Sequence, residues 1–161
     1  MSRVWKFGDN VDTDVITPSQ YKHQGKDVYV AHAMEPIDPM FADEVEPGDI
    51  VVAGRNFGSG SSRETAAIVF AEHEVGAIIA SSFARIFYRN AINLGLPVYV
   101  CPKAAADIEE DHEITINPDE NIIVNETTGE TYHPEPHPPF IREILDAGGL
   151  AAYREQFNSR N

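Results

Sequence analysis

The chain has 161 residues, 26 of them acidic and 12 basic, which gives a formal net charge of −14. This acidic excess argues against a nucleic-acid surface, because phosphate binding depends on clustered Lys and Arg. The single cysteine, Cys101, excludes an internal disulfide and cannot by itself hold an iron–sulfur cluster or a structural zinc ion.

Neither a signal sequence nor a membrane span is apparent in the chain. The opening residues "MSRVWKFGDN" contain no apolar signal core, and no apolar run approaches the roughly 18 residues that a span needs. We therefore expect a cytoplasmic protein with no membrane partner, folded as one domain over residues 1–161.

The first segment combines a strand pattern with closely spaced carboxylates. "RVWKF" alternates as a strand does, and the turn-rich "GDNVDTDVITPSQY" carries Asp9, Asp12 and Asp14. These aspartates lack the glycine and the terminal glutamate of a calcium-binding loop, which favours solvated or backbone-capping roles over metal ligation. We expect Asp14 to support the loop that follows.

That loop, "YKHQGK" from Tyr21 to Lys26, is a basic stretch in an acidic chain. Its polarity and its glycine predict a surface loop. The local contrast in charge makes it a candidate for binding an acidic ligand.

The next segments predict alternating strands and helices. "GDIVVAG" reads as a strand, "GRNFGSGSSRE" as a loop, and "SRETAAIVFAEHEV" as a helix. "GAIIAS", "FARIFYRNAINLG" and "PVYV" repeat the order strand, helix, strand, with Gly95 just beyond the helix end. This alternation predicts an α/β core of parallel strands.

The character of the chain changes after Cys101. "HEITINPDENIIVNETTGETY" predicts short antiparallel strands, and "PPFIREILDAGGLAAYREQF" predicts one or two closing helices. His133 and His137 lie four residues apart between them, but the intervening prolines forbid the helix that would bring them to one face. We expect no metal site on this chain.

The glycine-serine loop is the strongest candidate for a ligand site. A helix N-terminus leaves backbone N–H groups unpaired and carries partial positive charge, so the loop from Gly58 and Gly60 into the helix suits an anion. Ser61 and Ser62 add hydroxyl groups, and the planar fork of Arg63 suits a carboxylate or a phosphate.

Other loop types match this one poorly. A phosphate loop needs a lysine before its Ser or Thr, a dinucleotide fingerprint needs glycine where Arg63 stands, and a hydrolase elbow needs glycine where Glu64 stands. A tight turn in which a serine merely caps the helix remains an alternative.

Three segments in register resemble a known family. "GDNVDTDVITPSQY", "VVAGRNFGSGSSRE" and "SFARIFYRNAINLGLPV" are similar to the small subunits of 3-isopropylmalate dehydratase, in the aconitase superfamily, and "PPFIREILDAGGL" also matches. The resemblance covers nearly the whole chain. It implies the swivelling β/β/α domain of that superfamily, with a mostly parallel core and an antiparallel addition.

The resemblance also implies a function. The chain would dock on a large subunit that carries a [4Fe–4S] cluster and binds none itself, and the pair would move a hydroxyl group between adjacent carbons of a di- or tricarboxylic hydroxy acid. Ser61 would act as the base, while Ser62 and Arg63 would bind carboxylate oxygens, with Gly58 and Gly60 shaping the loop. The pathway that the resemblance implies is leucine biosynthesis.

Two differences from relatives affect the choice of substrate. Many relatives have cysteine where Ser59 stands and histidine where Thr65 stands. In relatives, the loop that here contains Lys22 and His23 discriminates between substrates with an apolar branch and substrates with an extra carboxylate. His23 predicts neither type of substrate, because an imidazole can be neutral or charged near neutral pH.

Three further interpretations remain open. Arg85 and Arg89 lie one helical turn apart, and we expect Arg85 to shape the site or the subunit contact. Homoaconitase, citraconate hydratase and 2,3-dimethylmalate hydratase subunits are alternatives within the same class. A non-catalytic anion-binding regulatory module is the alternative from another class.

Overall fold

A computed structural model describes residues 2–60 and 64–159. The strands are β1 Val4–Lys6, β2 Ile50–Ala53, β3 Ala77–Ala80, β4 Val98–Val100, β5 Ile114–Asn117, β6 Ile122–Asn125 and β7 Thr131–Tyr132. The helices are α1 Thr13–Ile16, α2 Lys26–Ala31, α3 Phe41–Glu44, α4 Thr65–Glu72, α5 Arg85–Asn93, α6 Pro102–Asp107, α7 Pro139–Ala147 and α8 Leu150–Ser159.

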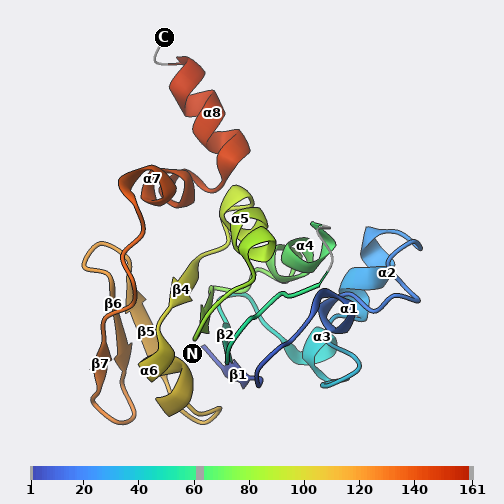
Figure 1. Cartoon of the computed structure of the whole chain (residues 1–161), viewed down its shortest axis with the longest axis horizontal. Helices are drawn as coiled ribbons and strands as arrows, with labels where there is room; N and C mark the ends of the chain where they lie inside the picture. The colour runs from blue at the N-terminus through green and yellow to red at the C-terminus, as the bar shows by residue number, and fades with distance from the viewer. Residues whose placement is uncertain (1, 61–63, 160–161) are drawn as a thin grey trace.

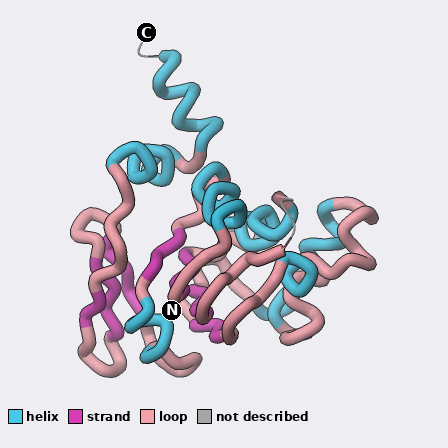
Figure 2. Tube along the Cα trace, viewed as in Figure 1, coloured by secondary structure: helices cyan, strands magenta, loops and turns pink. Residues whose placement is uncertain are grey.

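The strands form two sheets (Figures 1 and 2). Strands β1 to β4 pair in parallel and in chain order, with Val4 opposite Ile50 and Ile50 opposite Ala77. Strands β5, β6 and β7 form an antiparallel sheet. The prediction of a parallel α/β core with an antiparallel addition is confirmed.

The parallel sheet is the middle layer of three. Residues of β2 alternate between two cores: Val51 packs with helices α4 and α5, whereas Val52 packs with α6 and the antiparallel sheet. Strands β2 and β3 are therefore buried along their whole length, which explains why they read as continuous apolar runs. Three layers of this kind are the β/β/α arrangement that the resemblance implies.

Short helices lie where the sequence shows mainly turns. Helix α1 falls inside the aspartate-rich segment, α2 begins after Gly25, whose φ is +106°, and α3 precedes β2. None of them exceeds 6 residues, too short for hydrophobic periodicity to reveal. Helix α6 was missed for the same reason.

The predicted end of the "FARIFYRNAINLG" helix is confirmed. Leu94 caps α5, and Gly95 follows it with φ +76° at the C′ position. Two helices close the chain, α7 and α8, and α8 extends away from the three layers (Figure 1).

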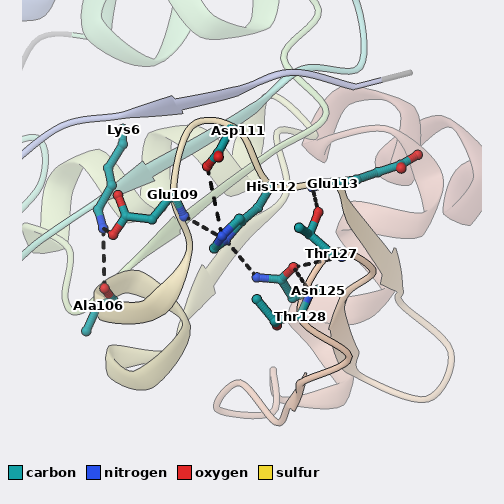
Figure 3. Close-up of polar contacts among 9 residues, drawn as sticks. All are labelled: Lys6, Ala106, Glu109, Asp111, His112, Glu113, Asn125, Thr127 and Thr128. Carbon is teal, nitrogen blue, oxygen red and sulfur yellow. Dashed lines mark hydrogen bonds and ion pairs between the residues drawn. The ribbon is translucent and has the colours of Figure 1, made fainter.

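A buried polar network holds the loop before β5 to the end of β6 (Figure 3). The side-chain amide of Asn125, which is 0% exposed, lies 3.0 Å from His112 Nδ1, and Asn125 Oδ1 accepts hydrogen bonds from the backbone N–H groups of Thr127 and Thr128. The backbone N–H of Glu109 also donates to His112 Nδ1. These bonds satisfy polar groups that would otherwise be buried without partners.

Lys6 ties the end of β1 to the segment around α6 (Figure 3). Its Nζ lies 3.0 Å from Glu109 Oε1 and 3.3 Å from the carbonyl oxygen of Ala106. The outer layer is thus fixed against the middle one by polar contacts as well as by the apolar core.

Candidate functional site

The loops that follow β1, β2 and β3 meet at the carboxyl edge of the parallel sheet, where α/β proteins commonly bind ligands. The backbone N–H of Gly58 donates to the carbonyl of Val11 at 2.7 Å, and that of Phe57 donates to the carbonyl of Ser82 at 3.1 Å. Ala84 in turn donates its N–H to the carbonyl of Phe57 at 2.9 Å. These bonds continue the sheet past its named strands and fix the entry to the glycine-serine loop.

Asp9 is part of this framework. Its Oδ1 accepts the backbone N–H of Arg55 at 2.7 Å, and its Oδ2 lies 3.4 Å from the Arg55 guanidinium. The backbone hydrogen bond from Arg55 holds the pKa of Asp9 below its ordinary value, and the guanidinium lowers it further, against the raising effect of burial. Asp9 therefore stabilises the loop after β2 through its hydrogen bonds with Arg55.

Asp12 caps α1. Its Oδ1 accepts the backbone N–H of Val15 at 2.9 Å, while the neighbouring Thr13 donates its N–H to the carbonyl of Ser59 at 2.8 Å. The capping role is the one that the sequence favoured over metal ligation. Across residues 2–60 and 64–159, no group of three His, Cys, Asp or Glu side chains is placed to hold a metal ion.

Gly58 and Gly60 occupy positions where a side chain would be costly. Gly58 has φ +83°, and a Cβ there would lie 2.3 Å from the ring of Phe87. Gly60 has φ +105°, and a Cβ there would lie 3.1 Å from Thr13 Oγ1. Both glycines adopt left-handed backbone conformations that favour glycine, and they let the loop pack between α5 and α1.

An aromatic cluster supports the loop from beneath. Phe57 is fully buried directly before Gly58, and its ring packs edge-on against Phe87 at 5.2 Å between centroids. Phe70 of α4 lies 5.7 Å from Phe57. Neither Phe57 nor Phe87 was predicted from the sequence to support the loop, although an apolar residue directly before the glycines was the available signal.

The central candidate residues, Ser61, Ser62 and Arg63, lie outside the described residues. The segments that flank them are described: Gly60 lies against α1, and Glu64 directly precedes the first residue of α4. Helices α1 and α2 both contact α4. The ends of the candidate loop and the aspartate segment are therefore brought together at one edge of the sheet.

The basic loop from Tyr21 to Lys26 is tied to the same region. Lys22 Nζ lies 3.8 Å from Asp14 Oδ1, and its side chain is 20% exposed. Lys26 forms an ion pair with Glu72 of α4 at 3.1 Å, and the hydrogen bond that Lys26 Nζ donates to Glu72 raises the pKa of Lys26. His23 is exposed at the tip of the loop.

Asp14 Oδ1 thus lies near Lys22 of the loop and also accepts a hydrogen bond from Ser19 Oγ, which precedes the loop, at 3.3 Å.

Arg85 is the first residue of α5 and is exposed, one turn before the exposed Arg89. In the described part of the chain, neither guanidinium has a carboxylate within ion-pair distance. No described contact joins Arg85 to Lys22 or His23, so the structure does not bring these predicted site residues together directly.

His133 and His137 do not form a pair. His133 is exposed, whereas His137 Nε2 donates to the carbonyl of Val98 at 2.7 Å and its ring lies between Tyr88 and Tyr99. His137 therefore anchors the connector between β7 and α7 to β4.

A middle parallel sheet with helices on one face and a second, antiparallel sheet on the other is the arrangement of an aconitase-type swivel domain. Residues 8–101 match the family model described as the Aconitase C-terminal domain, and the chain belongs to that family.

Full-length relatives give a narrower assignment. The chain is 47% identical over 94% of its length to the 3-isopropylmalate dehydratase small subunit of Ruminiclostridium cellulolyticum, of which 93% is covered. It is 50% identical over 91% of its length to the small subunit of Moorella thermoacetica, with 89% of that protein covered. Within the family, the chain belongs with the 3-isopropylmalate dehydratase small subunits, a hydro-lyase group.

A solved structure agrees with this placement. The crystal structure of 3-isopropylmalate dehydratase from Methanocaldococcus jannaschii superposes with a TM-score of 0.89 at 42% identity, covering 99% of this chain and 96% of that one. The resemblance inferred from the sequence motifs is confirmed, and the relatives do not favour the homoaconitase, citraconate, dimethylmalate or regulatory alternatives.

Proposed function

We propose that this chain is the small subunit of a heteromeric enzyme that isomerises 2-isopropylmalate to 3-isopropylmalate, in leucine biosynthesis and in the cytoplasm. The observation that carries the proposal is the sequence identity of 47% to 50%, over 91% to 96% of this chain, with proteins named as small subunits of that enzyme. In the described part of the chain, no helix is both long and apolar enough to cross a bilayer.

The residues of this chain do not fit an iron–sulfur cluster. Cys101 is the single cysteine; it is buried and takes the capping position before α6. A cluster needs several thiolate ligands. We therefore place the [4Fe–4S] cluster on the large subunit, where its iron would act as a Lewis acid on the leaving hydroxyl group.

The chain's own contribution would come from the glycine-serine loop. Ser61 would take the proton from the carbon beside a carboxylate, while Ser62 and Arg63 would hold carboxylate oxygens of the hydroxy acid. Serine is a weak base, so this role needs hydrogen-bond donors that stabilise its alkoxide-like form. The first backbone N–H groups of an α-helix such as α4, which have no partner within the helix, are donors of the right kind.

Two neighbouring segments would complete the site. The loop carrying Lys22 and His23 would contact the branch of the substrate and determine which branch is accepted. Asp14 would stabilise the conformation of that loop through its contact with Lys22. Arg85 and Arg89 would face the large subunit, because two exposed guanidinium groups that form no ion pair with the described carboxylates suit those of a partner.

The proposal is tested by reconstituting the chain with a cluster-bearing large subunit and assaying a panel of hydroxy acids. We expect the pair to turn over 2-isopropylmalate in preference to the substrates of homoaconitase, citraconate hydratase and dimethylmalate hydratase. Neither chain alone should be active. Turnover by this chain without a partner, or preference for another acid, would contradict the assignment.

A further inference from the structure

Three side chains join the start of the basic loop to the turn after α2. The ring of Tyr21 stacks on the imidazole of His32, with centroids 3.7 Å apart and an interplanar angle of 9°. The hydroxyl group of Tyr21 donates to Glu35 Oε1 at 3.2 Å. His32 Nδ1 contacts the other oxygen of the same carboxylate, Glu35 Oε2.

The carboxylate of Glu35 is the centre of this arrangement, since each of its oxygens holds one partner. The hydrogen bond from His32 is the main cause that lowers the pKa of Glu35, the hydrogen bond from Tyr21 adds to it, and burial opposes both. An ionised carboxylate makes stronger hydrogen bonds than a neutral acceptor, so both rings are held in place around neutral pH.

Tyr21 transmits this constraint to the loop. Its backbone N–H donates to the carbonyl of Pro18 at 2.9 Å, and its own carbonyl accepts the N–H of Gln24 at 3.0 Å. At the far end, Gly25 turns the chain into α2 with φ +106°. Residues 22–24, of which His23 and Gln24 are exposed, are therefore held between Tyr21 at one end and the start of α2 at the other.

We infer that Tyr21, His32 and Glu35 form a positioning clamp that fixes Lys22 and His23 for reading the substrate branch. This inference rests on the proposed function, because it assigns these three residues to the orientation of its specificity loop. His32 and Glu35 contact Tyr21, the first residue of the loop, so their effect on substrate passes through the loop to Lys22 and His23. Loss of a contact in the clamp therefore changes the ratio of kcat/KM between substrates more than it changes kcat.

The first test is amide hydrogen exchange on the full chain, which needs no partner or substrate. Tyr21→Phe keeps the ring stack and removes the bond to Glu35. We expect exchange of the Gln24 amide to accelerate by about threefold to tenfold, the usual effect of one lost hydrogen bond. Tyr153→Phe is the matched control, because it removes a similar hydroxyl bond to Glu143. Unchanged exchange in Tyr21→Phe, or an equal change in the control, would overturn the clamp.

The second test is the ratio of kcat/KM between 2-isopropylmalate and an analogue with a carboxylate in place of its isopropyl branch. In the reconstituted pair, Tyr21→Phe and Glu35→Gln should each shift this ratio by about threefold or more while kcat for 2-isopropylmalate stays within about twofold. Glu143→Gln should change neither quantity. Wild-type ratios in both clamp variants would overturn the inference.

The two arms separate the failure of the inference from that of the proposed function. A wild-type pair that turns over neither compound would refute the proposed function, and the exchange data would then decide alone whether the clamp holds the loop.

Discussion

At the scale of single residues, Gly58 shows how closely the candidate loop is packed. Its φ of +83° already disfavours a side chain, and the ring of Phe87 fills the space where a Cβ would lie. Gly129 has the same φ of +83° with nothing within 4 Å of a Cβ. A comparison of substitutions at Gly58 and Gly129 therefore separates the free-energy cost of backbone strain from that of steric overlap.

We predict that Gly58→Ala destabilises the chain by about 3 kcal/mol or more, because left-handed backbone strain and overpacking add. Gly129→Ala should cost only about 1–2 kcal/mol, from strain alone. Urea unfolding of the two variants measures both values. Equal losses would show that Phe87 does not confine the loop.

Arg63 supplies a second residue-scale prediction. Arg63→Lys keeps the charge but loses the planar fork, so it should mainly raise KM, by a factor that corresponds to about 1.5–3 kcal/mol for one lost charged hydrogen bond. Steady-state kinetics of the reconstituted pair give the value. A fall in kcat at unchanged KM would instead show that Arg63 stabilises the transition state and not the bound substrate.

At the scale of elements, the connector before α7 depends on a neutral histidine. Burial is the main cause that lowers the pKa of His137 below 6.5, opposing the hydrogen bond to Val98, which raises it. The unfolded chain therefore binds this proton at a higher pH than the folded chain does. The stabilisation is fully present above pH 6.5 and declines as the pH falls from there toward the lowered folded-state pKa.

We predict that the melting temperature falls as the pH drops below about 6.5, and that His137→Gln reduces this slope. His133→Gln is the matched control, because His133 is exposed on the same connector. Melting curves at stepped pH values give the slopes. An unaltered slope in His137→Gln would remove this histidine as the cause.

Helix α5 carries the prediction about assembly. We predict that Arg85→Glu combined with Arg89→Glu weakens binding to the large subunit by about tenfold or more, since like charges across an interface cost affinity. Arg154→Glu on α8 combined with Lys103→Glu on α6 is the control, because it makes the same change in net charge at two exposed positions away from α5. Titration of labelled large subunit at two salt concentrations measures affinity and its charge dependence. Equal affinity for the double variant and the wild type would exclude α5 from the interface.

The sequence predicted the regular elements better than the irregular ones. Strands β2 and β3 and helix α5 have strong apolar patterns, and Gly95 marked the end of α5 correctly. Helices α1 to α3 were missed, because a cap such as Asp12 defines a short helix without creating a periodic apolar face.

The candidate site was predictable in composition and less so in geometry. The glycine-serine loop is visible in the sequence, as is its place between a strand and a helix. The backbone bonds from Gly58 to Val11 and from Phe57 to Ser82 join segments far apart in the chain. The contacts of Tyr21 with His32 and Glu35 depend likewise on how α2 turns back. No local pattern could predict these tertiary contacts.

At the scale of the whole molecule, the site that we propose lies at one edge of the parallel sheet. The aspartate segment, the described start of the glycine-serine loop up to Gly60 and the start of α5 meet there. The single cysteine of this chain cannot hold a cluster. The central claim is therefore that the loop supplies a base to chemistry completed by a second subunit.

The turnover number of the reconstituted pair carrying Ser61→Ala tests this claim most directly. We predict a fall in kcat of about 10² to 10⁴, the usual contribution of a positioned general base, with little change in KM and normal assembly. If Ser61 only capped α4, its loss would instead lower stability by about 1 kcal/mol and leave catalysis intact. A Ser61→Ala pair with near-normal kcat and a lowered melting temperature would contradict the catalytic assignment.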